Sequence, residues 1–377
     1  MAIEKKLDLV DISLETTRRC NLKCTYCMAR PQTKPSRGEL TTEEIKHRVI
    51  DELAQITERA VIYFTGGEFL LREDRLEILE YNRSKGFTAN VLTNGILVNE
   101  KTIEEIRKVT SGKFFFTFSI NSIDEELNRA SRNDSLSTFQ RCMQLCEEMG
   151  VGFYALTTVS KGNLSSLGRT MNYLRMMQIP VLRDPFVPRG AGKHHKDLRI
   201  SKEDMEQIVH PTLRENPLAY ASYTPFFIPP EYMEKKAREF EGFGILNFGC
   251  YCGSRFAGIS AEGDVAPCPL LVDSVKYGNV GEDSLAEILL SHPVFLALER
   301  SEVKGKCGIC RYKKVCKGCR ALAYYKSGDV LAEDPICFFE PEDETSVSEL
   351  EKITQGNLER FLDYAQYTSK IWDKIFD

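Results

Sequence analysis

The chain has 377 residues, of which 42% are hydrophobic and 28% are charged, and its formal net charge is −5. This balance is typical of a globular protein with room for one large domain and one smaller domain. The sequence has no long apolar run and no basic block, so we expect no membrane span and no nucleic-acid partner. It also has no signal-peptide pattern, so we expect a cytoplasmic location.

Short apolar segments alternate with amphipathic segments over the first half of the chain. Strands are predicted over Leu9–Leu14, Ala60–Phe64, Ala89–Leu92, Phe114–Ile120, Phe153–Thr158 and Pro180–Pro185. Helices are predicted over Thr42–Thr57, Arg72–Lys85, Lys101–Val109, Ser135–Met149 and Leu164–Met177. This alternation predicts parallel βα units, which form either a doubly wound sheet or a partial barrel. In both folds, functional residues gather at the carboxyl ends of the strands.

The second half of the chain has a different character. Residues 191–247 form a predicted bridging segment, with a helix from Ser201 to Val209 and a stretch rich in proline and aromatic residues at Tyr220–Met233. Residues 248–340 are rich in cysteine and loops, as expected of a small domain that a metal stabilises. Residues 341–377 are predicted to form a helical tail, because their apolar side chains recur at helical spacing.

The sequence has thirteen cysteines, and eleven of them fall into two compact groups. In a chain without an export signal, short Cys-x-x-Cys spacings favour metal or cluster ligation over disulfide formation. The other two, Cys142 and Cys146, are four residues apart on a predicted helix. We interpret them as small buried hydrophobic residues.

The first group is Cys20, Cys24 and Cys27, directly after the first predicted strand. A [4Fe–4S] cluster needs four ligands, so three cysteines on one loop leave one iron open to another molecule. A structural zinc site would require a fourth cysteine or histidine close by, and this segment has none. The spacing therefore favours an iron–sulfur cluster.

With Tyr26 before the last cysteine, this segment resembles the CxxxCxΦC signature of the radical S-adenosylmethionine (SAM) superfamily. The resemblance implies a partial (βα)6 barrel over residues 8–190. It also implies a cluster whose open iron binds the amino and carboxylate groups of SAM. In that family, SAM is cleaved reductively to a 5′-deoxyadenosyl radical, which abstracts a hydrogen atom from the substrate.

A second motif, Gly66-Gly67-Glu68, follows the second predicted strand. Glycines there permit close backbone approach, and a carboxylate can meet an ammonium group. The family's Gly-Gly-Glu motif binds the amino group of SAM, although Phe69 stands where the family usually has proline. Polar residues that end the third and fourth predicted strands are further candidates for contacts to SAM, with turn formation as the alternative role: Asn94, Ser119 and Asn121.

Other polar residues fall near the same strand ends. Glu15 ends the first predicted strand, and Arg183 and Asp184 end the last one, so all three are candidates to face the cavity. The basic loop from Arg189 to Lys196 is interpreted as solvated, with binding of substrate carboxylates as the alternative.

The second cysteine group contains Cys250, Cys252, Cys268, Cys307, Cys310, Cys316, Cys319 and Cys337. Eight thiols match the ligand number of two [4Fe–4S] clusters, and two zinc sites fit the count equally well. The arrangement resembles the SPASM extension of radical SAM enzymes. The resemblance implies that Cys307, Cys310, Cys316 and Cys337 hold one auxiliary cluster and that Cys250, Cys252, Cys268 and Cys319 hold the other.

Two features depart from the SPASM pattern. The spacing between Cys316 and Cys319 is one residue short, and the Cys250-x-Cys252 pair contains an extra cysteine. The second departure leaves open which thiol of that pair is a ligand, or whether both are.

Together the two resemblances imply an oxidoreductase with three [4Fe–4S] clusters, SAM, and an electron donor such as flavodoxin or ferredoxin. The first strand begins by residue 9, so we expect no N-terminal domain that binds a peptide leader. We therefore favour a carboxylate-bearing small molecule such as a tetrapyrrole over a ribosomal peptide or protein as substrate. The alternatives from other classes are a non-catalytic iron–sulfur electron carrier and a zinc scaffold.

Overall fold

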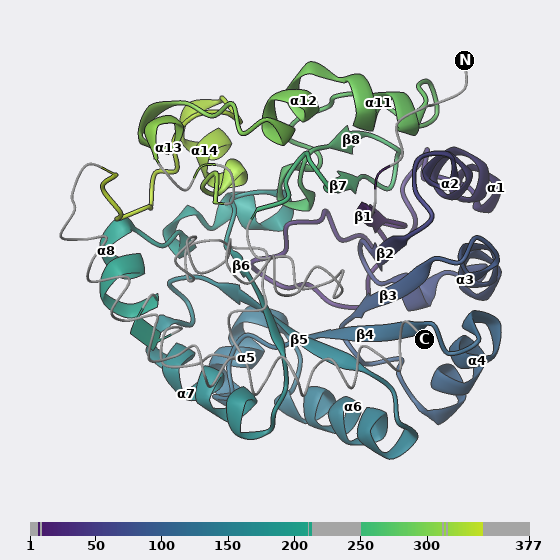
Figure 1. Cartoon of the computed structure of the whole chain (residues 1–377). Helices are drawn as coiled ribbons and strands as arrows, with labels where there is room; N and C mark the ends of the chain where they lie inside the picture. The colour runs from purple at the N-terminus through teal and green to yellow at the C-terminus, as the bar shows by residue number, and fades with distance from the viewer. Residues whose placement is uncertain are drawn as a thin grey trace.

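The computed structural model describes residue 7 and residues 10–209, 211–212, 250–310, 313 and 316–341. An eight-stranded sheet lies at its centre, in the order β6-β5-β4-β3-β2-β1-β7-β8 (Figure 1). Neighbouring strands from β1 to β6 pair in parallel, β7 pairs in parallel with β1, and β8 pairs antiparallel with β7. The strands are β1 (Val10–Glu15), β2 (Ala60–Thr65), β3 (Thr88–Thr93), β4 (Phe114–Ser119), β5 (Phe153–Val159), β6 (Val181–Pro185), β7 (Phe256–Ile259) and β8 (Val265–Ala266).

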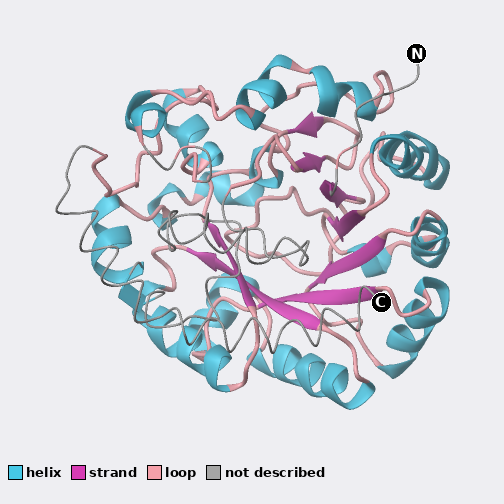
Figure 2. Ribbon diagram, viewed as in Figure 1, coloured by secondary structure: helices cyan, strands magenta, loops and turns pink. Residues whose placement is uncertain are grey.

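Helices cover the outer, convex side of this curved sheet, while its inner side faces the middle of the molecule (Figure 2). The predicted α/β partial barrel is confirmed, and each of the six predicted strands is present. The outer helices are α1 (Thr42–Glu44), η1 (Ile45–Ile50), α2 (Asp51–Ile56), α3 (Arg75–Ser84), α4 (Glu100–Thr110), α5 (Glu125–Arg132), α6 (Leu136–Met149) and α7 (Leu164–Met176), and the short helix η2 (Phe69–Leu71) follows β2.

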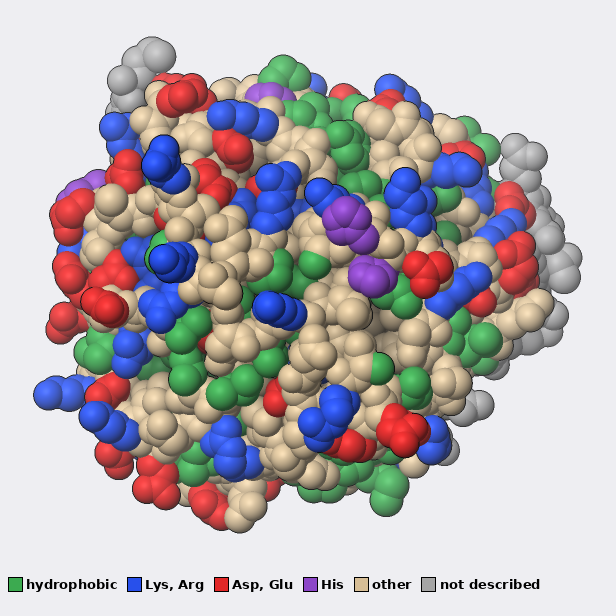
Figure 3. Space-filling model, turned by 180° about the vertical axis from the view of Figure 1, so that it is seen from behind, with side chains coloured by type: hydrophobic (Ala, Val, Ile, Leu, Met, Phe, Trp, Pro, Cys, Tyr) green, Lys and Arg blue, Asp and Glu red, His purple; other side chains and the backbone are tan. Residues whose placement is uncertain are grey.

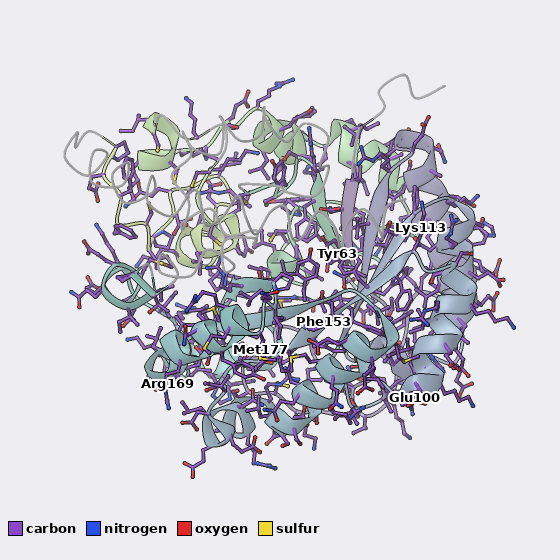
Figure 4. All side chains as sticks on the ribbon, turned by 60° about the horizontal axis from the view of Figure 1, so that its bottom comes forward. Tyr63, Glu100, Lys113, Phe153, Arg169 and Met177 are labelled. Atoms are coloured by element: carbon purple, nitrogen blue, oxygen red, sulfur yellow. The ribbon has the colours of Figure 1, made fainter. Side chains whose placement is uncertain are left out.

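The two faces of the sheet are separated by the alternation of side chains along each strand. On β1, Ile12 and Leu14 pack into the main hydrophobic core, while Glu15 lines an inner cavity. Tyr63 belongs to a second, smaller apolar cluster, to which side chains of β3, β4, β5, β6 and β7 also contribute. Figure 4 shows Tyr63 on the sheet, whereas Glu100 and Arg169 lie on the outer helices. Burial of each large apolar side chain stabilises the barrel by about 1.5–3 kcal/mol.

Local signals explain which helices the sequence predicted. The segment predicted over Thr42–Thr57 forms one continuous helix (α1, η1 and α2), which begins with a capping box between Thr41 and Glu44. Helix α5 was not predicted. Its only buried residues are Asn128 and Arg132, so it has no apolar stripe for a periodicity argument to detect. Cys142 and Cys146 are fully buried on α6, as expected.

After β6 the chain forms short helices and then a small cysteine-rich module, residues 250–341. The first part contains η3 (Gly190–His194), η4 (Lys196–Leu198), α8 (Lys202–Asp204) and η5 (Met205–Val209), so the helix predicted from Ser201 to Val209 is present. The module contains β7, β8, η8 (Pro269–Leu271), α11 (Leu285–Ser291), α12 (Pro293–Glu299), α13 (Gly305–Ile309) and α14 (Arg320–Ser327). It lies at the β1 edge of the barrel, coloured green to yellow in Figure 1.

Two predicted features lie outside the described residues, namely the proline-rich stretch at Tyr220–Met233 and the helical tail after residue 341. Among the helices that the structure describes, none is long and apolar enough to cross a membrane. Acidic and basic side chains are interspersed over the face seen in Figure 3.

Candidate functional site

A cavity lies at the carboxyl ends of the barrel strands. Its lining brings together eight residues that the sequence predicted, from the first cysteine group and from the ends of β2, β3 and β4: Cys20, Cys24, Tyr26, Cys27, Gly66, Gly67, Asn94 and Ser119. Glu15 and Asp184 also line it, as expected. Glu68, Asn121 and Arg183 are not among the described residues that form its wall.

The three thiols lie on the cysteine loop, which we define as residues 16–32. Burial raises the pKa of Cys20 to about 11 and that of Cys27 to about 12. Within the described ranges, no three histidine, cysteine, aspartate or glutamate side chains converge where a single metal ion could sit. A [4Fe–4S] cube takes one thiolate at each iron, so its ligands are spread over the corners of the cube. Three thiols around one cavity fit this donor set.

The Gly-Gly-Glu motif packs directly on the backbone of the cysteine loop. The Gly67 N–H donates to the Thr17 carbonyl at 2.6 Å, and the Glu68 N–H donates to the Arg19 carbonyl at 2.8 Å. A Cβ atom on Gly66 would lie 2.4 Å from the Thr17 oxygen, and one on Gly67 would lie 2.2 Å from the Arg19 oxygen. Both glycines are therefore required for this close approach.

Glu68 lies beneath the cavity wall and holds two strand ends together. Its carboxylate accepts hydrogen bonds from the Leu70 N–H at 3.1 Å, the Thr93 hydroxyl at 2.9 Å and the Asn94 N–H at 2.9 Å. Burial raises its pKa, and these donors oppose the rise. Asn94 in turn donates from its side chain to Asn21 of the cysteine loop at 2.7 Å. The ends of β2 and β3 are thus fixed relative to the cysteines.

Arg132, at the end of α5, is a cavity residue that the sequence analysis missed. Its Nη1 donates to the Tyr26 hydroxyl at 2.9 Å, and its Nη2 forms an ion pair with Asp134 at 3.8 Å. Nη2 is buried and has no hydrogen-bond acceptor in the described part of the chain. A buried guanidinium nitrogen at a cavity is suited to binding a carboxylate. The signal in the sequence that could have indicated this residue was a highly charged segment without an apolar stripe.

Asn121 is buried and hydrogen-bonded entirely to neighbouring protein groups in the contacts observed. Its N–H donates to Asn128 at 3.2 Å, its side-chain nitrogen donates to Ser131 at 3.3 Å, and its oxygen accepts from the Thr158 N–H at 3.2 Å. It therefore connects the ends of β4 and β5 to α5, which carries Arg132.

The basic loop after β6 contacts the cysteine loop. The Gly192 N–H donates to the Cys27 carbonyl at 3.1 Å, and the Ala191 N–H donates to the Ala29 carbonyl at 3.2 Å. A Cβ atom on Gly190 would lie 2.0 Å from the Ala29 oxygen. The loop therefore supports the backbone of the cysteine loop, and only part of it, including the exposed His194, is solvated.

A buried ion network joins the barrel, this loop and the cysteine-rich module. Arg18 pairs with Glu15 at 2.6 Å, with Glu262 at 2.5 Å and with Asp273 at 2.7 Å. Arg189 pairs with Glu15 at 2.6 Å and with Asp273 at 3.4 Å. Burial alone would raise the pKa of Asp273, but the two guanidinium groups hold it below its usual range. Glu15 of this network also interacts electrostatically with Cys27 of the cysteine loop.

Seven of the eight cysteines of the second group fall into two neighbourhoods. The Cys252 thiol is within hydrogen-bonding reach of Cys250 and Cys268, and Cys319 interacts electrostatically with Cys268 and Cys250.

In the second neighbourhood, Cys316 interacts in the same way with Cys337 and Cys307. Residues distant in sequence, from 250 to 337, are thus gathered into one small module.

A half-barrel with a three-cysteine loop at its strand ends, joined to a second cysteine-rich module, defines an iron–sulfur enzyme that binds SAM. The family model of the radical SAM superfamily matches residues 14–174, and that of the SPASM iron–sulfur cluster-binding domain matches residues 250–320. The chain belongs to the radical SAM superfamily and carries a C-terminal SPASM domain.

Similar proteins support this assignment. An AdoMet-dependent heme synthase of Methanosarcina barkeri is 34% identical over 345 residues, which cover 88% of this chain and 96% of that protein. A PqqA peptide cyclase of Granulibacter bethesdensis is 24% identical over 339 residues, which cover 87% of this chain and 86% of the cyclase.

A solved structure has the same fold. Streptococcus suis SuiB bound to the precursor peptide SuiA matches with a TM-score of 0.65 and 17% identity, covering 88% of this chain and 76% of SuiB. Since the relatives are synthases and cyclases, the chain is an enzyme and not a scaffold or electron carrier.

Proposed function

We propose that this enzyme cleaves SAM reductively and uses the 5′-deoxyadenosyl radical to abstract a hydrogen atom from a tetrapyrrole that carries carboxylate side chains. The observation that carries the radical chemistry is that three thiols and the Gly66-Gly67 backbone line one cavity. A tetrapyrrole is favoured because the heme synthase relative is 34% identical, whereas the peptide cyclase relative is 24% identical.

The first cluster would be held by Cys20, Cys24 and Cys27, and it would supply the electron for the cleavage of SAM. The remaining protein groups would position SAM. Gly66 and Gly67 let their motif pack directly on the cysteine loop, and the Nη2 of Arg132, which has no hydrogen-bond acceptor among the described residues, matches a carboxylate.

We propose that the other predicted residues support SAM binding in two ways. Tyr26, Asn94 and Ser119 line the cavity and would contact SAM directly. Glu68 and Asn121 lie behind the wall and would contribute through the strand ends that they hold.

The eight cysteines of the SPASM domain would hold two auxiliary clusters, which gives three [4Fe–4S] clusters in total. Cys250, Cys252, Cys268 and Cys319 would form one set, and Cys307, Cys310, Cys316 and Cys337 the other. This division is supported by the two neighbourhoods of thiols described above. We also propose the domain limits 8–190, 191–247, 248–340 and 341–377, with a flavodoxin or ferredoxin as electron donor. A cytoplasmic location stays a prediction.

The cavity offers both apolar surface and a proton-exchanging group to a substrate. Leu92, Leu156 and Val187 line it beside Asp184. Burial raises the pKa of Asp184 to about 6, so this carboxyl group can exchange a proton near neutral pH. Apolar walls suit a macrocycle, and a protonated Asp184 can donate a hydrogen bond to one of its carboxylates.

The test is 5′-deoxyadenosine formation by the anaerobically reconstituted enzyme with SAM and dithionite. Adding a tetrapyrrole with propionate side chains should raise the rate above the substrate-free rate. When those side chains carry deuterium, the deuterium should be transferred to 5′-deoxyadenosine. A PqqA-type peptide is the matched comparison. Stimulation and deuterium transfer with the peptide, but not with the tetrapyrrole, would overturn the proposed substrate.

A further inference from the structure

Arg320 is a buried cation in the cysteine-rich module. It begins helix α14 directly after Cys319, and its side chain is only 1% exposed. Burying a guanidinium group away from water costs several kcal/mol unless a negative charge lies beside it. The contacts of Arg320 should therefore reveal what compensates its charge.

Most of those contacts are with neutral groups. Nε donates to the Gly318 carbonyl at 3.3 Å, and Nη1 donates to the carbonyls of Val330 at 3.0 Å and Ala332 at 2.5 Å. Within the described residues of the module, Lys276, Lys304 and Lys306 each form an ion pair with a carboxylate, and no carboxylate forms an ion pair with Arg320. These hydrogen bonds satisfy the nitrogens, but they place no carboxylate in contact with the guanidinium group.

The carboxylate of Asp334 is hydrogen-bonded to groups other than Arg320. Its carboxylate accepts the backbone N–H of Cys319 at 2.5 Å and that of Ile336 at 3.0 Å. Asp334 therefore interacts with Arg320 only through space, without an ion pair between the two in the described structure. It fixes the turn that carries Arg320 instead.

The remaining nitrogen of Arg320 faces a thiol. Nη2 donates to the Cys307 sulfur at 3.8 Å, and the backbone N–H of Asp334 donates to the same sulfur at 3.4 Å. Gly318, with φ +71°, makes this contact possible. A Cβ atom there would lie 2.8 Å from Arg320 Nη2 and 2.9 Å from the Cys307 sulfur. The backbone is thus shaped to bring a cation to Cys307.

We propose that Arg320 is a positioning residue whose charge compensates the cluster held by Cys307, Cys310, Cys316 and Cys337 and raises its reduction potential. This inference rests on the cluster assignment proposed above. A [4Fe–4S] cluster with four thiolates is an anion, and its reduced state carries one more negative charge. Hydrogen bonds and positive charge at its sulfurs therefore favour reduction. The auxiliary cluster that Arg320 faces accepts electrons more readily because of this residue.

The experiment is a redox titration monitored by electron paramagnetic resonance on full-length protein, in a Cys24→Ala background that leaves the two auxiliary clusters. Arg320→Gln should shift the midpoint potential of the cluster at Cys307 strongly to a more negative value, and shift that of the other cluster by less, because Cys250 interacts with Arg320 through space alone. Arg320→Lys, which keeps the charge, should shift the potential of the cluster at Cys307 less. Lys304→Gln removes an exposed cation of the same module and should change neither potential.

The outcomes separate this inference from the proposed function. If the wild-type chain binds about four irons and not about twelve, the cluster assignment itself fails before any potentials are compared. If all clusters assemble and Arg320→Gln titrates as its parent does, the role of Arg320 is overturned. If Arg320→Gln loses the cluster, Arg320→Lys decides: assembly near the parental potential supports a charge requirement, and loss of the cluster there refutes it.

Discussion

The barrel and the SPASM domain each bury an arginine beside cysteines, and they compensate its charge in different ways. In the barrel, Arg18 pairs with three carboxylates, Glu15, Glu262 and Asp273. In the SPASM domain, Arg320 has neutral acceptors and the Cys307 sulfur. The first arginine is neutralised by the protein itself, so it serves the structure. The second has no carboxylate in contact and directs one nitrogen to a thiol of the proposed cluster.

The two regions also differ in how the chain gathers its thiols. The barrel presents its three cysteines on one loop, from Cys20 to Cys27, against the backbone of Gly66 and Gly67. The SPASM domain assembles residues that lie between 250 and 337, so its ligand sets depend on folding of the whole module. Damage to one thiol should therefore remain local in the barrel and spread further in the SPASM domain.

The largest expected effect comes from a substitution that removes the cluster of the barrel and leaves those of the SPASM domain in place. Cys24→Ala should reduce 5′-deoxyadenosine formation to background, because an iron of the first cluster loses its ligand. The auxiliary clusters should remain, so iron content should fall from about twelve to about eight per chain. Iron and sulfide analysis with chromatography of the nucleoside measures both quantities.

Cys146→Ala is the matched control, since Cys146 is fully buried in the apolar core of α6. It should retain iron and SAM cleavage. Undiminished 5′-deoxyadenosine formation in Cys24→Ala would refute the assignment of the cysteine loop as the active-site ligand set.

The next effect tests the ion network that joins the two regions. Arg189→Gln removes a buried guanidinium from Glu15 and Asp273 and should destabilise the folded enzyme by about 3–5 kcal/mol. Urea unfolding under anaerobic conditions measures this as a lower midpoint. Arg169→Gln, on the outer face of α7, breaks an exposed pair with Asp124 and should cost about 0–1 kcal/mol. Equal midpoints for the two variants would show that the network contributes no stability.

Much of the barrel was predictable because its signals are local. Short apolar segments between amphipathic ones predicted the six strands, and the spacing of Cys20, Cys24 and Cys27 predicted the loop that lines the cavity. Helix α5 was missed because its buried residues, Asn128 and Arg132, are polar. Arg132 was missed with it, since only the fold brings its guanidinium to Tyr26.

The ion network and the role of Arg320 were not predictable from the sequence for a related reason. Arg18 meets Asp273 across more than two hundred positions of chain, and Arg320 meets Cys307 through a turn at Gly318. A charge pattern read along the chain does not indicate such partners. The sequence placed Arg189 in a solvated loop, whereas packing buries it between the two regions.

A smaller effect is confined to the barrel and tests the close packing of its two motifs. Gly67→Ala would place a Cβ atom 2.2 Å from the Arg19 carbonyl oxygen, so the cysteine loop must shift. We expect SAM cleavage to fall by about 10–100-fold, which corresponds to about 1.4–2.7 kcal/mol, with the auxiliary clusters intact. Gly168→Ala, within α7, has room for the added methyl group and should leave activity unchanged. A Gly67→Ala enzyme of normal rate would show that the loop tolerates displacement.

The last effect concerns a buried carboxyl group, that of Asp11. Burial raises the pKa of Asp11 to about 7 against the opposing charge of Arg255, and Asp11 Oδ1 has no hydrogen-bond partner among the described residues. The native state therefore holds this proton more tightly than the unfolded chain. The contribution of Asp11 to stability is consequently retained at low pH and lost as the pH rises from about 4 to about 7. Asp11→Asn should remove this loss and be more stable than the wild type at pH 8, by on the order of 1–4 kcal/mol.

Urea midpoints measured from about pH 5 to about pH 8 test this prediction, with the exposed Glu126→Gln as control. Parallel pH profiles for Asp11→Asn and the wild type would mean that Asp11 stays ionised, and that the protein interior compensates its charge as fully as the ion network compensates Arg18.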